Sequence, residues 1–343
     1  MTSSSRVASQ SPQVDSAPSA VQSKDEPWSE AAPQSEAAPR SEAGPGSGGG
    51  DDVGRVVLAA TPIGNVADAS ARLVDLLGHA DIVAAEDTRR LYDLARRLGV
   101  HVSGRVVAYH DHNEKSLSSG LLDEVERGAT VLVVSDAGMP LINDPGTAIA
   151  HGAIDRGLPL TCAPGPSAVL DALALSGLPT DRFCYEGFLP RRHGERVRRL
   201  RSLRAEVRTM VFYETPHRIG ESMDDIAQAF GPDRPMALCR ELTKDYEEIR
   251  RGSVSRIVRS VHDDPPRGEM VLVVAGASQE EMMEASESIL GVDDMARLAI
   301  AMSSDEGIRV KDAIARVVAE HPLPDGSLAS RRQVYAAVMA QRG

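Results

Sequence analysis

The chain has 343 residues and a mass of 36.6 kDa, which is enough for two domains with separate hydrophobic cores. Its formal charge of −12 excludes a protein that holds nucleic acid by bulk positive charge, and an aromatic content of 3% disfavours a stacking platform for single strands. No apolar run approaches the ~18–20 residues that span a bilayer, and the 3 cysteines lie too far apart for a disulfide framework or a CxxC zinc site. These limits favour a globular, cytoplasmic enzyme with no membrane contact.

The first 54 residues differ in composition from the rest of the chain. They consist mainly of Ser, Ala, Pro, Glu and Gly and contain almost no branched aliphatic residues. Such a segment cannot bury enough apolar surface to offset the entropy lost on folding, so residues 1–54 are predicted to form a disordered tail.

From Arg55 onward, short strands alternate with amphipathic helices. Strands are expected at 56–60, 82–85, 106–109, 131–135 and 160–162, and helices at 70–77, 88–98, 114–127 and 147–156. This alternation predicts an N-terminal α/β domain over residues 55–165, with a mostly parallel sheet covered by helices on both faces.

A second, less regular set of elements follows. Strands are expected at 182–187, 209–213, 236–241 and 269–274, helices at 195–204 and 216–230, and an added antiparallel hairpin at 246–258. We expect a C-terminal α/β domain over residues 166–277. Residues 278–343 contain no convincing strand and are predicted to form a small helical appendage, with helices at 297–302, 311–320 and 331–341.

The loops that follow the strands carry the residues suited to a ligand site, because ligands bind beyond the carboxyl ends of strands in open α/β sheets. The longest, 135–146, is polar and rich in glycine and proline, and its unpaired backbone groups suit an adenosine or amino-acid moiety. Segments 61–65 and 163–167 are shorter turns of similar rigidity. No GxGxxG follows a strand and no GxxxxGK[ST] is present, which argues against NAD enzymes and P-loop NTPases.

Two segments combine charged residues at strand ends. The first segment holds Glu86, Asp87 and Arg89, which could take part in the chemistry. The alternative is that Asp87 only caps the following helix. Segment 110–114 (His-Asp-His-Asn-Glu) has the residue types of a metal site, but alternating side chains at a strand end point to opposite sides. We expect turn hydrogen bonds or substrate contact there, and no bound metal.

Residues 191–208 hold eight arginines against two glutamates, a local charge of +6 in an acidic chain. Val197, Leu200 and Leu203 would form the buried face of a helix, which leaves the arginines mostly on the solvent side. This face is either simply solvated or a surface that contacts phosphates, and Arg331 and Arg332 could extend it.

Nine ordered segments together resemble those of a known family, the ribosomal RNA methyltransferases of the tetrapyrrole methylase superfamily. The resemblance covers about residues 55–275 and rests on segments 61–65, 85–89, 110–114, 135–138, 141–146, 181–190, 212–218, 240–244 and 268–272. It implies two α/β domains with S-adenosylmethionine in the cleft between them, and a homodimer. It also implies 2′-O-methylation of the ribose of a decoding-centre cytidine in 16S rRNA, as free rRNA or within the 30S subunit.

The resemblance also implies a role for particular residues. The methyl donor would be bound by Pro62, Gly138, Met139, Pro140, Leu141, Ile142, Pro164, Gly165, Ser167, Tyr213, Leu242 and Thr243. Met139 departs from the family, which commonly has Thr at this position; only a role for a hydroxyl group would be lost. The charged segments themselves, rather than the resemblance, suggest the RNA-binding residues, which are Arg89, Arg191, Arg192, Arg196, Arg198, Arg199, Lys244, Arg331 and Arg332.

A ribose 2′-hydroxyl is a weak nucleophile, so a general base is expected close to it. The candidates are Glu86, Asp87 and Glu214, the last of which could instead anchor His217 and Arg218. Two other functions remain open: C-methylation of a tetrapyrrole, whose carboxylates also attract arginine, and a non-catalytic ribosome-binding module with a vestigial cleft.

Overall fold

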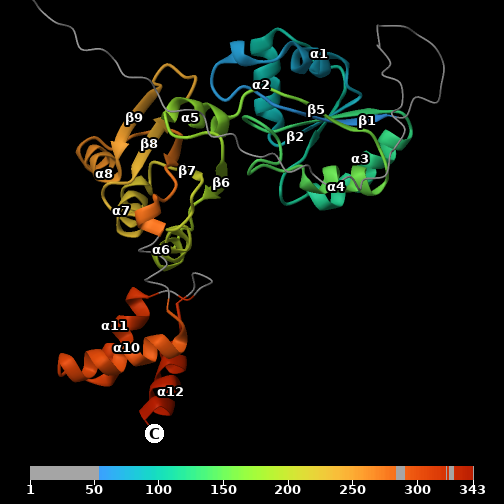
Figure 1. Ribbon diagram of the computed structural model, residues 1–343. Coiled ribbons are helices and arrows are strands. Elements are labelled where there is room, and N and C mark those ends of the chain that lie inside the picture. Colours follow the sequence, from blue (N-terminus) through green and yellow to red (C-terminus); the bar gives the residue numbers. More distant parts are fainter. Residues whose placement is uncertain (1–53, 283–289, 322, 324–327, 343) are drawn as a thin grey trace, which may run out of the picture. The chain divides into compact units, whose positions relative to one another are not determined.

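The computed structural model describes residues 54–282, 290–321, 323 and 328–342. The expected tail, apart from Gly54, lies outside the described residues. The two predicted α/β sheets are confirmed, and each has its own helices (Figure 1).

The first sheet has five parallel strands in the order β3-β2-β4-β1-β5. Its strands are β1 (Arg55–Ala59), β2 (Ile82–Ala85), β3 (Arg105–Ala108), β4 (Thr130–Val134) and β5 (Leu160–Ala163). The connections hold a short 3₁₀ turn, η1 (Val66–Asp68), and the helices α1 (Ala71–His79), α2 (Thr88–Leu98), α3 (Glu114–Glu126) and α4 (Thr147–Asp155).

Helices cover both faces of this sheet (Figure 1). Successive strand residues point to opposite faces, so Val57 packs with the α1 and α2 side chains while Val56 packs with those of α3 and α4. Leu73 of α1 and Ile149 of α4 are fully buried on the two sides. A parallel sheet covered on both faces brings the carboxyl ends of its strands to one edge, where the loops with ligand chemistry follow.

The second sheet also has five strands, in the order β6-β7-β10-β8-β9, and it is mixed. Its strands are β6 (Phe183–Phe188), β7 (Thr209–Glu214), β8 (Pro235–Arg240), β9 (Glu248–Ser253) and β10 (Met270–Val274), of which β6 and β7 run parallel. α5 (Ala168–Ser176) packs on one face; α6 (His193–Ser202), α7 (Ile219–Phe230) and α8 (Val254–Asp263) pack on the other.

The hairpin expected at 246–258 is wrong in its second half. β9 does pair antiparallel with β8, but the chain then turns into α8. Val254, Ile257 and Val261 follow helical spacing and are all buried against the sheet. The prediction failed because the strand and the helix follow each other without a loop.

The C-terminal helices are α10 (Val292–Asp305), α11 (Val310–Glu320) and α12 (Arg331–Arg342), and α10 is longer than expected. They share a small core that includes Met295, Val317 and Val334. Within the described ranges, no helix has the length and apolar character needed to cross a membrane.

Candidate active site

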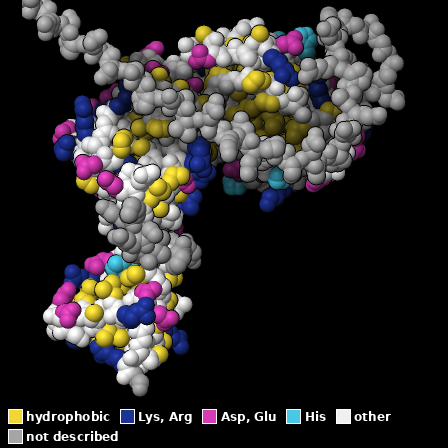
Figure 2. Space-filling model, viewed as in Figure 1, with side chains coloured by type: hydrophobic (Ala, Val, Ile, Leu, Met, Phe, Trp, Pro, Cys, Tyr) yellow, Lys and Arg dark blue, Asp and Glu magenta, His cyan; other side chains and the backbone are white. Residues whose placement is uncertain are grey.

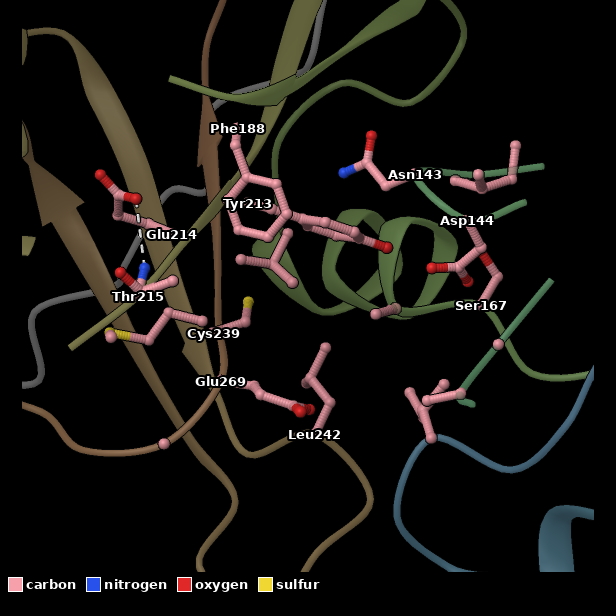
Figure 3. A pocket seen from close by; sticks show the side chains of 18 of the residues that line it. Asn143, Asp144, Ser167, Phe188, Tyr213, Glu214, Thr215, Cys239, Leu242 and Glu269 are labelled. Carbon is pink, nitrogen blue, oxygen red and sulfur yellow. Dashed lines mark hydrogen bonds between the residues drawn. The ribbon is translucent and has the colours of Figure 1, made fainter. Parts of the chain in front are cut away.

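A cavity of about 380 Å³ lies at the carboxyl ends of the strands, within the size range of small-molecule sites. The loops after β1, β4 and β5 supply one wall, which includes Ile63, Gly138 and Ser167. The second sheet supplies the other wall, which includes Tyr213 and Leu242 (Figure 3). Its lining is mostly apolar, and no lysine or arginine of the described chain is part of it. The cavity can therefore hold a largely apolar ligand that carries positive charge.

Gly138 forms part of the wall through its backbone. Its N–H donates to the Thr61 carbonyl at 3.0 Å and its carbonyl accepts from the Thr61 N–H at 2.9 Å, which joins the loops after β1 and β4. Gly138 has a φ of +80°, in the left-handed region that favours glycine. A Cβ at this position would stand 3.5 Å from Ile63 Cγ2, an ordinary van der Waals contact, so the left-handed backbone rather than a lack of space favours glycine here.

The loop between β4 and α4 presents Asp144 to the cavity (Figure 3). This loop is strained, because the non-glycine residue Asn143 has a φ of +67°. Contacts on both sides hold it: Asn143 Nδ2 donates to Tyr185 Oη at 2.7 Å, and the Gly146 N–H donates to Glu114 Oε2 at 2.9 Å. The position of Asp144 is thus fixed by contacts to α3 on one side and to β6 on the other.

Asp144 has an unusual electrostatic environment for a carboxyl group. Its pKa is raised to about 7, first by burial and then by the neighbouring carboxylates of Glu86, Asp136 and Asp111, while a hydrogen bond with Ser135 opposes the rise. A carboxylate with such a pKa can accept a proton near neutral pH.

Three aromatic side chains gather at the other side of the cavity. The Tyr213 ring lies edge-on to Tyr185 and Phe188, with ring centroids 5.1 and 5.5 Å apart. Burial raises the pKa of both Tyr185 and Tyr213, so both phenols remain neutral. Phe188 lines the cavity and is 49% exposed, and it offers a face to a flat ring such as a nucleobase.

Glu86 and Asp87, both expected as catalytic candidates, are not part of the cavity lining. Asp87 caps α2 by accepting from the Arg89 N–H at 2.8 Å, and it pairs with the Arg89 guanidinium at 2.9 Å. These contacts lower the pKa of Asp87 to about 2, which makes it a weak base. Glu86 accepts from the Asp136 N–H at 3.3 Å, and burial raises its pKa.

Glu214 lies at the cavity, but its carboxylate is occupied. It is 2% exposed and accepts from Arg218 Nη2 at 3.1 Å, from the Thr215 N–H at 3.1 Å and from the Ser222 hydroxyl. This geometry favours the interpretation of Glu214 as an anchor for Arg218 over that of a base.

The residues expected at the donor site fall into two groups. Six of them line the cavity: Gly138, Met139, Ile142, Ser167, Tyr213 and Leu242. The others lie in adjoining segments: Pro62 lines a neighbouring groove, Gly165 and Thr243 line a hollow beside α5, and Pro140, Leu141 and Pro164 belong to the loops that carry the lining.

The sequence reasoning missed several lining residues, among them Asn143, Asp144, Phe188 and Glu269. The first two belong to the polar loop 135–146, which was singled out as a whole. Their exact role depends on side-chain direction, for which the only sequence signal was the Asp-Pro-Gly turn that ends the loop.

A more open groove of about 660 Å³ adjoins the cavity and shares Ile63, Ala137 and Glu269 with it. Four cationic side chains line the groove: Arg89, Arg90, Arg97 and Lys244. Lys244 Nζ pairs with Glu241 at 3.0 Å and with Glu269 at 3.1 Å. The groove therefore presents four cationic side chains, and Arg89, Arg90 and Lys244 among them are held by ion pairs with carboxylates.

The arginines of α6 and of the two residues before it do not share one environment. Arg191, Arg192, Arg198 and Arg199 are exposed, although Arg199 pairs with Glu186. Arg196 differs from the expectation: it is 1% exposed, and its guanidinium contacts Asp225 at 2.6 Å and Glu221 at 3.3 Å, so it cannot reach RNA.

Charge on the surface seen in Figure 2 is mixed. Arg331 and Arg332 are exposed at the start of α12. On the face visible in Figure 2, Lys and Arg side chains lie among Asp and Glu rather than forming one continuous basic surface. Any contact with a polyanion must therefore rest on particular arginines and not on the overall field.

Segment 110–114 forms a turn. The Asn113 side chain accepts from the His110 N–H at 2.8 Å and donates to the Ala108 carbonyl at 3.0 Å. Among the residues that the structure describes, no group of three or more His, Cys, Asp or Glu side chains is placed to hold a metal ion.

Comparison with known proteins identifies relatives along most of the described chain. The family model of the tetrapyrrole (corrin/porphyrin) methylases matches residues 55–258. The ribosomal RNA small subunit methyltransferase I of Mycobacterium tuberculosis (strain ATCC 25618 / H37Rv) is 45% identical over 289 residues, which is 84% of this chain and 96% of that protein. The protein of the same name from Bacillus subtilis (strain 168) is 35% identical over 287 residues, 84% of this chain and 94% of the relative.

Among solved structures, the crystal structure of the methyltransferase CobJ matches with a TM-score of 0.50 and 19% identity, over 65% of this chain and 95% of that one. A likeness at this identity shows the fold.

Proposed function

We propose a function on the premise that this chain belongs to the tetrapyrrole (corrin/porphyrin) methylase family. In this proposal the chain methylates the ribose 2′-oxygen of a decoding-centre cytidine in 16S rRNA. The methyl donor is S-adenosylmethionine. The two relatives named ribosomal RNA small subunit methyltransferase I that are described above share 45% and 35% identity with this chain over 96% and 94% of their own length, which supports the acceptor class.

The single observation that carries the chemistry is a donor-sized cavity next to a groove with cationic side chains. The donor is a cation at sulfur with a flat purine at one end, and it supplies an activated methyl group. The cavity fits it, because the lining holds carboxylates, apolar side chains and an exposed aromatic ring but no lysine or arginine. The residues that would hold it are Gly138, Met139, Ile142, Ser167, Tyr213 and Leu242.

The RNA would approach along the groove, where Arg89 and Lys244 lie within reach of phosphates. The exposed arginines 191, 192, 198 and 199, with Arg331 and Arg332, would contact more distant parts of the particle. Arg196 is left out because it is buried. In this proposal the chain acts as a homodimer. Sedimentation of the purified protein tests this oligomeric state.

The acceptor is tested by incubating the full chain and methyl-labelled donor with three acceptors: 30S particles, naked 16S rRNA and a tetrapyrrole. We expect label in RNA and none in the macrocycle. Label in the tetrapyrrole alone would contradict RNA methylation and indicate C-methylation of the macrocycle. Donor binding without transfer to any acceptor would contradict the proposed substrate, while the fold and the donor site would stand.

Groove arginines should contribute to RNA affinity by pairing with phosphates. Replacing Arg89 or Arg97 by Ala should weaken binding and make the slope of log K against log salt about 0.7–0.9 shallower for each phosphate that is no longer neutralised. Arg127→Ala is the matched control, since Arg127 ends α3 at the opposite edge of the first sheet and pairs with Glu124 at 2.9 Å. Filter binding of 30S particles at several salt concentrations measures the slopes. Equal slopes for all three variants would exclude the groove.

A further inference from the structure

We propose that Asp144 is the general base of the reaction and takes the proton from the ribose 2′-hydroxyl. This inference rests on the proposed function and assigns its proton transfer to a residue outside the candidates Glu86, Asp87 and Glu214. The position of Asp144, the contacts that hold it there and the charges around it all support this role.

Asp144 lies in the cavity that would hold the methyl donor, and the ribose 2′-hydroxyl must reach into this cavity to be methylated. It lines the cavity together with Ser167 and Tyr213, and its carboxylate points into the open space (Figure 3). The same loop also carries Gly138, Met139 and Ile142 of the expected donor site. A group on this loop therefore stands beside the methyl donor.

The conformation of the loop and its hydrogen bonds hold Asp144 in that position. Leu141 and Asn143 both have positive φ values, +74° and +67°, a conformation that non-glycine residues keep only when the surroundings enforce it. The enforcing contacts are the hydrogen bond from Asn143 to Tyr185 and the bonds from the N–H groups of Gly146 and Ala148 to the Glu114 carboxylate. Backbone strain of this kind is found at functional sites, and here it fixes the direction of the Asp144 carboxylate.

The charges around Asp144 suit a base. Carboxylates face it from three strand ends: Glu86 after β2, Asp111 after β3 and Asp136 after β4. The neutral phenols of Tyr185 and Tyr213 face it from the second sheet. Burial and these like charges hold the pKa of Asp144 near 7, so the group is a stronger base than an ordinary aspartate and is still ionised above that pH.

The other carboxylates are poorer choices. Asp87 is partly exposed, caps α2 and is neutralised by Arg89. Glu214 has its oxygens taken by Arg218, Ser222 and the Thr215 N–H. Glu86 lies outside the cavity lining, from where it acts on Asp144 through its charge.

The step balances without any further reactant. The Asp144 carboxylate takes the 2′-hydroxyl proton while a lone pair of that oxygen forms a bond to the methyl carbon. The carbon–sulfur bond of the sulfonium donor breaks, and its electron pair stays on sulfur as a neutral thioether. The products are the 2′-O-methyl ribose, S-adenosylhomocysteine and a protonated Asp144, which releases its proton to solvent.

The test compares single-turnover rates of Asp144→Asn, Glu86→Gln and the unaltered chain on 30S particles at saturating donor, from pH 5.5 to 9. The unaltered chain should lose rate as the pH falls below about 7, because the base becomes protonated. Asp144→Asn should lower the plateau rate about 100-fold or more, the usual range for a general base. Calorimetry measures donor affinity separately, and because all rates are taken at saturating donor, a lower plateau rate reports the transfer step and not weaker donor binding.

Glu86→Gln should keep the plateau rate and move the rate midpoint to lower pH, because one like charge beside Asp144 is removed. Asp111→Asn, an exposed position outside the site, is the control for charge alone and should give a smaller shift in the same direction. A plateau rate for Asp144→Asn within about threefold of the unaltered chain would overturn the inference. A loss of rate in Glu86→Gln without a midpoint shift would transfer the role to Glu86. No methylation by the unaltered chain would overturn the proposed function instead.

Discussion

Replacing Gly138 by valine should weaken binding of S-adenosylmethionine by about 100-fold or more, equivalent to about 2.7 kcal/mol. Valine is β-branched, and at a φ of +80° its Cβ clashes with its own backbone, so the loop must shift and break its paired hydrogen bonds with Thr61. Isothermal titration calorimetry with the donor measures the effect.

Gly99→Val is the matched control. Gly99 has a similar φ of +70° as the C-cap of α2, and nothing lies within 4 Å of the position of its Cβ. It therefore carries a comparable backbone penalty at a site away from the cavity, and its donor affinity should stay unchanged. Wild-type affinity in Gly138→Val would show that the donor lies elsewhere.

Replacing Glu214 by alanine should lower the free energy of unfolding by about 3–5 kcal/mol. The carboxylate is buried and holds Arg218 and Ser222, so its removal leaves a partly buried guanidinium without its counter-charge. Urea denaturation followed by circular dichroism measures this decrease.

Glu269→Ala is the control for Glu214→Ala. Glu269 also pairs with a cation, Lys244, but its side chain is 77% exposed, so the decrease in stability should stay within about 1 kcal/mol. If Glu214→Ala kept its stability and lost only its methylation rate, Glu214 would be a catalytic group and the anchor interpretation would be wrong.

The fold was largely readable from the sequence because the first sheet is regular. β4 and β2 are continuous apolar runs buried on both faces, and caps such as Ser70 and Gly99 mark the helix ends. The hairpin error at α8 arose where a polar edge strand, β9, leads directly into a helix. Local patterns cannot separate two elements that share a boundary residue.

The sequence predicts which loops form the site, but it does not predict the roles of individual residues in those loops. The sequence places Asp144 in a polar turn, and only the fold brings Glu86, Asp111 and Asp136 close enough to change its acidity. Arg196 shows the same limit, since its exposure depends on Asp225, a residue of the neighbouring helix α7. Burial and pairing across elements are tertiary properties, so residue type and spacing alone cannot assign them.

The most direct test of the central claim is to map the methyl group. The full chain is incubated with 30S particles and methyl-labelled S-adenosylmethionine, and the rRNA is digested with nuclease and analysed by mass spectrometry. We predict a single labelled nucleoside, 2′-O-methylcytidine, in the decoding-centre fragment. Label on a base, on another nucleotide or on protein would contradict the proposed reaction.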